Sequence, residues 1–64
     1  MNLRKYEGQN VVIITTSGKT FNGFVHDYFF PEDNDNEKES IFLKTNDGEF
    51  IEFNEEAIEE IKIK

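Results

Sequence analysis

The chain has 64 residues, a net charge of −7 and no cysteine. A chain of this length forms one small domain, 1–64, and buries only about 60% of the surface that its unfolded form exposes. These features exclude a deep enclosed pocket, a disulfide framework and a thiolate zinc site, so we expect no cofactor, metal or small-molecule substrate. No apolar run approaches the roughly 18 residues of a membrane helix, and no signal peptide is visible. We therefore expect a cytoplasmic protein with no membrane contact.

The charge differs sharply between the two halves of the chain. Residues 1–30 carry three basic and two acidic side chains, a net charge of +1, whereas residues 31–64 carry four lysines and twelve acids, a net charge of −8. Affinity for nucleic acid rests largely on Lys and Arg that neutralise phosphates, so a uniformly basic groove is excluded. The acids either keep a small domain soluble or face a basic partner.

The apolar residues favour β-structure. Ile, Val, Phe and Tyr together number 19, whereas Leu, Ala and Met number only 4. Side chains that are β-branched or aromatic suit a pleated sheet and lose rotamer freedom in a helix. The chain is therefore expected to be all-β.

The first half of the chain contains two predicted strands. Residues 3–7 form one helical turn that ends at Gly8. A strand over 11–16 and a tight turn over 17–19 follow. The second strand runs from Thr20 to about Phe30, and its glycine at position 23 indicates a bulge or a sharp bend.

The second half begins with an acidic segment, 31–39, which is predicted to be a solvated loop with nothing to bury. A strand over 40–45 is joined to a strand over 49–53 by Asn46-Asp47-Gly48, a strong hairpin signal. The segment 54–57 is predicted to be one helical turn with Asn54 as its N-cap. A fifth strand closes the chain over 58–64, with Ile61 and Ile63 directed inward.

Five short strands, a bent second strand and one helical turn before the last strand predict a small Src-homology-3-type barrel. A barrel removes most of the open edges that a sheet of this size would otherwise expose. On the second strand, simple alternation places Phe21, Val25 and Phe29 on one face and Phe24, His26, Tyr28 and Phe30 on the other. These aromatic residues either pack in the core or form a partner-binding patch around Tyr28 and Phe30.

The sequence offers no constellation for catalysis. His26 and Asp27 are neighbours on a strand, and alternation directs them to opposite faces. The few hydroxyl groups lie in strands and turns with no base spaced to activate them, so no enzyme is expected. The run from Asp33 to Glu39 resembles the start of a calcium loop, but Lys38 and Lys44 stand where Gly and Glu are required, which favours a plain loop.

The first half of the chain contains the pattern Val11-x-Ile13-x-Thr15-x-x-Gly18-Lys19-x-Phe21-x-Gly23-x-Val25, and its end contains Phe53-Asn54-Glu55-x-x-Ile58-x-x-Ile61. The first pattern resembles the first Sm motif and the second resembles the second Sm motif. The chain therefore resembles the Sm-like family, in particular small Sm-like proteins of Gram-positive bacteria. The resemblance covers nearly the whole chain and implies a five-stranded Sm-like barrel. It also implies a homo-oligomer in which the last two strands pair between subunits, with Phe50, Ile51, Glu52, Phe53, Ile61 and Ile63 as interface candidates.

The RNA-binding residues of Sm proteins do not carry over to this chain. The family places an Asp and an Asn in the loop after the second strand, and the Asp position falls here at Phe29. The family's Arg-Gly pair reads Asn54-Glu55, and a carboxylate beside a phosphate reverses the sign of the interaction. Any RNA contact is therefore expected to be weak and displaced from the usual residues.

Two hypotheses for function follow. The first is a non-enzymatic Sm-like binding or assembly module that self-associates and contacts RNA weakly. The second is an acidic interaction or inhibitor module that covers a basic surface of a nucleic-acid-binding protein. Its candidate face comprises the last acidic residues of the chain, namely Glu52, Glu55, Glu56, Glu59 and Glu60. Across these hypotheses, the ligand or partner candidates are Tyr28, Phe30, Asn54, Glu55 and Glu56.

Overall fold

The structure is a computed structural model that describes all 64 residues. It confirms the all-β prediction. The five strands are β1 (Asn10–Thr15), β2 (Thr20–Phe29), β3 (Ser40–Thr45), β4 (Phe50–Asn54) and β5 (Ile58–Ile63). The only helical elements are three short 3-10 turns, η1 (Arg4–Tyr6), η2 (Pro31–Asp33) and η3 (Glu55–Ala57). None of these turns is long enough to cross a membrane.

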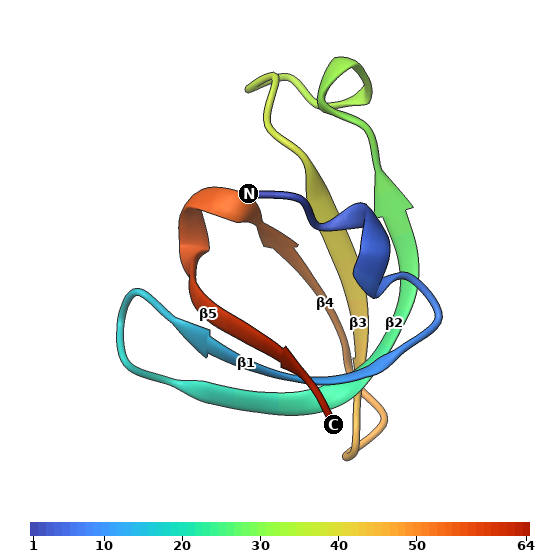
Figure 1. The fold of residues 1–64 in the computed structure, drawn as a ribbon, viewed down its shortest axis with the longest axis vertical. Coiled ribbons are helices and arrows are strands. Elements are labelled where there is room, and N and C mark those ends of the chain that lie inside the picture. Colours follow the sequence, from blue (N-terminus) through green and yellow to red (C-terminus); the bar gives the residue numbers. More distant parts are fainter.

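The strands form one antiparallel sheet with the order β4-β3-β2-β1-β5. The sheet is strongly curved. The long strand β2 bends, so that its first part pairs with β1 and its second part pairs with β3 (Figure 1). No ladder joins β4 to β5, so the sheet is open and these two strands are its edges. The loop after β2, the turn η3 and the N-terminus lie at one end of the molecule (Figure 1).

Two glycines make the tight turns of the hairpins, as predicted. Gly18 and Gly48 both have φ near +86°, a left-handed conformation that residues with a Cβ adopt only at a cost. In each hairpin the glycine N–H donates to the carbonyl of a threonine at the end of the preceding strand, at 2.9 Å. These two glycine turns fix the register of β1 with β2 and of β3 with β4.

Gly23 serves a different purpose from the bulge that the sequence suggested. Its register is regular, opposite Val11 on one side and Thr45 on the other. A methyl group there would overlap the carbonyl oxygen of Lys44 and lie 2.9 Å from the Cα of Thr45. Glycine is therefore required by the close approach of the β3 backbone, and the irregularity of β2 lies further along, between Val25 and Asp27.

The hydrophobic core lies on the inner face of the sheet. Its buried members come from every strand and from the N-terminal segment, namely Leu3, Val11, Ile13, Val25, Ile41, Leu43, Phe53 and Ile58. Leu3 is fully buried even though it lies near the chain terminus. The N-terminal segment therefore forms part of the core and is not an optional extension.

A buried carboxylate holds the N-terminal segment in place. The solvated-loop prediction for 31–39 is wrong at its last residue, because Glu39 is only 6% exposed. One of its oxygens accepts hydrogen bonds from the N–H of Leu3, at 3.1 Å, and from the hydroxyl of Tyr28, at 2.8 Å. The carboxylate is tolerated inside the protein because these donors replace water.

Candidate functional site

The free edge of β4 exposes main-chain hydrogen-bonding groups. At the two ends of the β3–β4 ladder, the N–H of Thr45 donates to the carbonyl of Glu49 at 2.8 Å and the N–H of Glu55 donates to the carbonyl of Glu39 at 3.1 Å. Main-chain groups alternate in direction along an antiparallel strand. The N–H and C=O groups of Phe50 and Glu52 therefore point away from β3, toward the open edge.

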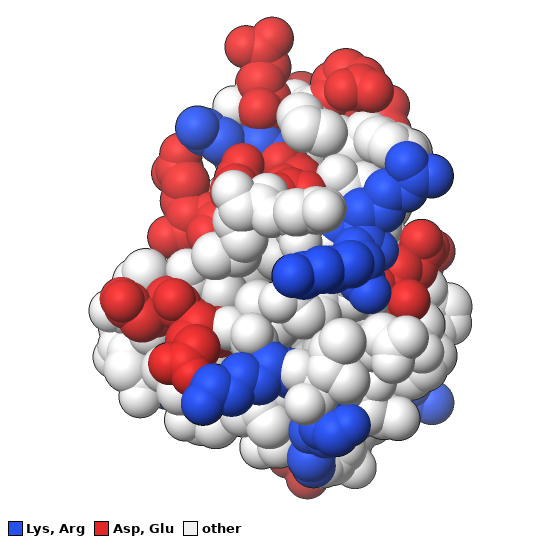
Figure 2. Space-filling model, in the orientation of Figure 1, with Lys and Arg blue, Asp and Glu red and all other residues white.

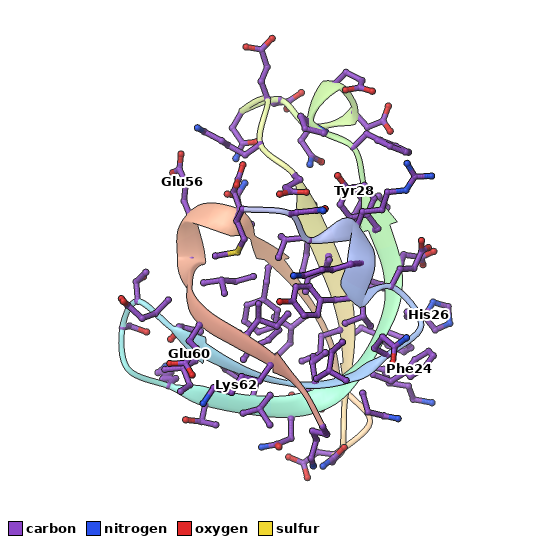
Figure 3. The ribbon with its side chains drawn as sticks, viewed as in Figure 1. Phe24, His26, Tyr28, Glu56, Glu60 and Lys62 are labelled. Atoms are coloured by element: carbon purple, nitrogen blue, oxygen red, sulfur yellow. The ribbon has the colours of Figure 1, made fainter.

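The free edge of β5 follows the same rule. The N–H of Lys64 donates to the carbonyl of Asn10 at 2.9 Å. Lys62 pairs with Val12 and Glu60 pairs with Ile14, so the main-chain groups of these two residues also point toward β1. Alternation then directs the main-chain groups of Ile61 and Ile63 to the open side. Lys62 and Glu60 form an ion pair at 2.8 Å on the outer surface, where the carboxylate raises the pKa of the lysine (Figure 3).

The side chains of the predicted interface differ in burial: some are exposed, some are half-buried and one is buried. Phe50 is 50% exposed, and Ile63, which was predicted to be directed inward, is 53% exposed because it lies near the end of an edge strand. Ile51 and Ile61 are half-buried against the core. Phe53 is 5% exposed and is a core residue, so its side chain does not reach an edge partner. The remaining candidate, Glu52, is exposed, and its carboxylate accepts a hydrogen bond from the Ser40 hydroxyl at 2.8 Å.

A bulge in β2 overturns the predicted alternation of its side chains. In the ladder with β3, Val25 lies opposite Leu43 and Tyr28 lies opposite Ile41, with one residue more on β2 than on β3 between them. The extra residue reverses the faces beyond it. Tyr28 therefore packs against the core, and Phe29 lies on the opposite face from Val25, contrary to the sequence-based assignment.

The same bulge brings together two residues that were predicted to point apart. The Nδ1 atom of His26 lies 3.0 Å from an Oδ atom of Asp27. Both side chains are about half exposed, and no further His, Cys, Asp or Glu joins them in a group of three that could hold a metal ion. The pair therefore orients the imidazole ring at the surface.

The outer face of β2, β3 and β4 carries a group of aromatic side chains, here called the aromatic face. Its members are Phe24, His26, Phe29, Phe42 and Phe50. The rings of Phe42 and Phe50 are stacked, with centroids 5.2 Å apart and planes at 19°. His26 meets Phe50 edge-on at 5.8 Å, and Phe29 meets Phe42 at 6.4 Å. Phe24 and His26 point away from the interior (Figure 3), so this face presents rings to solvent.

One cation of the chain already lies on the aromatic face. The Nζ of Lys44 is 5.8 Å from the centroid of Phe50, within the range of a cation–π contact. Lys44 is directly opposite Phe24 on β2 and Phe50 on β4. Sequence reasoning missed the contribution of Phe42 to this face. The alternation Ile41-Phe42-Leu43-Lys44, in which every second residue is aliphatic, was the signal that could have found it.

Tyr28 and Phe30, the predicted patch, behave differently from each other. The Tyr28 hydroxyl is committed to Glu39, and burial raises the pKa of this hydroxyl, with the hydrogen bond and the charge of Glu39 acting in the same direction. Phe30 is 39% exposed and meets Tyr28 edge-on at 5.1 Å. The guanidinium of Arg4 lies 5.1 Å above the Phe30 ring. The Tyr28 hydroxyl is therefore used internally, and Phe30 is covered in part by a cation.

Acidic side chains gather at the end of the molecule that carries the N-terminus (Figure 2). This acidic end combines the loop after β2 with η3. Asn54 caps η3 as predicted, by accepting a hydrogen bond from the N–H of Glu56 at 2.9 Å. Glu55 lies 3.4 Å from the terminal ammonium, and Glu56 lies 3.8 Å from Lys38. These weak, exposed pairs leave most of the acidic charge uncompensated. The contributing acids are Glu32, Asp33, Asp35, Glu37, Glu55 and Glu56.

A shallow polar hollow lies between the start of β2 and the β3–β4 turn. Its volume is about 360 Å³. Only one of its lining residues, Phe21, is hydrophobic, and that ring packs against Phe53 at 5.2 Å. The hollow contains no paired acid and base that would indicate catalysis.

Comparison with family models finds no match to this chain, and neither the curated proteins nor the solved structures contain a match. The edges, the aromatic face and the acidic end are therefore the features of the molecule that bear on function.

Proposed function

We propose that this protein is a non-enzymatic binding and assembly module with an Sm-like barrel architecture, and that it self-associates through its last two strands. The observation that carries this proposal is the placement of β4 and β5 at opposite edges of one open sheet. The segment resembling the second Sm motif runs from the end of β4 through η3 into β5.

Two different edges on one chain favour assembly into a closed ring. Contact between the β4 edge of one copy and the β5 edge of the next is heterologous, and repeating it gives a ring if the rotation closes. Each edge offers unpaired main-chain groups together with an exposed apolar side chain, Phe50 on β4 and Ile63 on β5. A small domain with few fully buried residues gains stability from such pairing.

The experiment is a measurement of oligomeric mass by light scattering for the native protein and for Ile63→Lys. The lysine places a charge on the β5 edge and is expected to shift the protein toward the monomer. Phe30→Lys is the control, since it adds the same charge at an exposed apolar residue away from both edges. A native protein that is monomeric at all concentrations would contradict the proposal. So would an unchanged oligomer in Ile63→Lys.

RNA contact at the usual Sm positions is expected to be weak. Phe29 is an aromatic residue of the outer face, Asn54 uses its side chain to cap η3, and Glu55 adds to the acidic end. The double variant Asn54→Arg with Glu55→Gly removes one acid and adds one cation, and is expected to raise affinity for a uridine tract in a filter-binding assay. An unchanged affinity in a protein that forms rings would show that these two positions do not explain the weak contact.

The acidic end favours a second candidate function, contact with a basic protein. Six carboxylates lie on its loop and turn, and the protein as a whole carries −7. Such a field attracts a positively charged surface and accelerates association. Binding to a basic protein is expected to weaken steeply with salt, and to weaken further in Glu55→Lys with Glu56→Lys. Salt-independent binding would remove this candidate.

A further inference from the structure

We infer that the aromatic face is a docking surface for an arginine-bearing segment of a basic partner protein. This inference rests on the second candidate above, a basic partner, and adds the surface and the side chain that would be recognised. It requires no self-association, because it uses outward side chains, and among these only Phe50 is also offered for contact at the β4 edge.

The first support is the number and arrangement of the rings. Phe42 and Phe50 stack at 5.2 Å, and His26 and Phe29 extend the group on either side. Phe24, which is 39% exposed, stands across β3 from Phe50. A flat guanidinium stacks on such rings while its N–H groups remain free to donate hydrogen bonds.

The second support is that the face already accepts a cation. Lys44 places its ammonium 5.8 Å from the Phe50 centroid. An ammonium on a flexible stem is a weaker and more hydrated ligand for a ring than a guanidinium. An incoming arginine is therefore expected to displace Lys44 from Phe50.

The third support is the charge at the margin of the face. Two acidic residues, Asp27 on β2 and Glu52 on β4, are the strand partners of Phe42. Their carboxylates contact His26 and the Ser40 hydroxyl respectively and have further lone pairs free. Each can accept from an arginine whose guanidinium lies on the neighbouring ring. Single-stranded nucleic acid also stacks on aromatic faces, but its phosphates need cations. Here one lysine stands against two carboxylates, so the charge favours the cationic peptide.

The experiment is fluorescence anisotropy with a labelled peptide of repeated Arg-Gly-Gly units, with the same peptide containing Lys for Arg, and with a uridine tract of similar length. The native protein is expected to prefer the arginine peptide to both other probes. Phe24→Ala and Phe50→Ala are each expected to weaken that binding about 2- to 5-fold, the loss of one exposed cation–π contact. Phe30→Ala is the matched control, because Phe30 has the same 39% exposure as Phe24 but lies outside the face.

Lys44→Gln gives a second test, in which binding is expected to become stronger and no aromatic residue is removed. The substitution removes the cation that competes for Phe50, so the arginine peptide is expected to bind more tightly. Equal losses in Phe24→Ala and Phe30→Ala would overturn the inference. So would a preference for the uridine tract that Lys44→Gln weakens. If the peptide binds and only Glu55→Lys with Glu56→Lys weakens it, this inference fails while the basic-partner candidate stands. If no basic probe binds, both fail.

Discussion

The two faces of β2, β3 and β4 contrast in chemistry although they belong to the same short strands. The inner face carries aliphatic side chains that are fully buried, such as Val25, Ile41 and Leu43. The outer face carries the rings of Phe24, Phe42 and Phe50, two of them more than a third exposed. Alternation along each strand produces both faces at once.

The contrast separates the residues that stabilise the fold from those available for binding. Rings on a solvated face bury little area and contribute little to stability. Several such rings placed side by side on an outer face are the observation from which we infer an interaction surface. Substitutions on the two faces should therefore affect different properties.

The largest expected effect comes from removing a buried aliphatic side chain. Leu43→Ala is expected to lower the free energy of unfolding by about 2–5 kcal/mol, through lost burial and the cavity that remains. Phe50→Ala, on the same pair of strands, is expected to cost less than about 1 kcal/mol, because its ring is half exposed. Urea denaturation of both variants tests the contrast, and equal losses would break it.

Gly23 tests how tightly the inner side is packed. Gly23→Ala inserts a methyl group against the Lys44 carbonyl, so β2 and β3 must separate, and a loss of about 3 kcal/mol is expected. Asn22→Ala, one residue earlier on the same strand, is the control and should cost much less. A tolerated Gly23→Ala, measured by thermal unfolding, would mean that the two strands do not approach each other this closely.

Glu39 tests the polar anchor beneath the N-terminal segment. Glu39→Ala leaves the N–H of Leu3 without its acceptor and is expected to cost about 1–3 kcal/mol. Hydrogen exchange at Leu3 should also accelerate in this variant. Glu37→Ala, a solvent-exposed acid in the same loop, is the comparison and should leave both properties unchanged. Unaltered exchange at Leu3 in Glu39→Ala would contradict the anchor.

The smallest expected effect is a loss of stability at alkaline pH. The raised pKa of Tyr28 means that the folded protein holds the phenol proton more tightly than the unfolded chain does. Its contribution is therefore full below the ordinary pKa of 10.0 and is lost as the pH rises through the higher pKa of the folded state. Tyr28→Phe should flatten this part of the pH profile of unfolding. The pKa of Lys62 is also raised, so Lys62 likewise contributes stability that is lost at alkaline pH. Because Tyr28→Phe retains Lys62, any pH dependence of unfolding that remains in this variant includes the contribution of Lys62.

Local signals in the sequence were sufficient for the order of the five strands and for the turns η1 and η3, but not for η2, which lies in the segment predicted to be a plain loop. The glycines of the hairpin turns, the cap at Asn54 and the clustered β-branched residues each act over a few positions. Glu39 could not be recognised in this way, because its partners Leu3 and Tyr28 are distant in sequence and only the fold brings them to one carboxylate.

The faces of β2 were the main sequence-based error. Side chains alternate between the two faces of a sheet only while each residue of one strand pairs with one residue of the next. The extra residue between Val25 and Tyr28 breaks this pairing, so every later residue of β2 lies on the face opposite to the predicted one. The sequence contains no glycine or proline at that point to mark the bulge. The joint surface location of His26 and Asp27, and the outward position of Phe29, both follow from this single residue.

Native mass spectrometry of the protein isolated gently from its own cells tests the central claim, assembly through the open edges, most directly. We expect masses at a fixed multiple of 7.5 kDa, lost in Ile63→Lys and kept in Phe30→Lys. A native protein found only as a single copy, either bare at 7.5 kDa or bound to a different protein, would contradict assembly through β4 and β5.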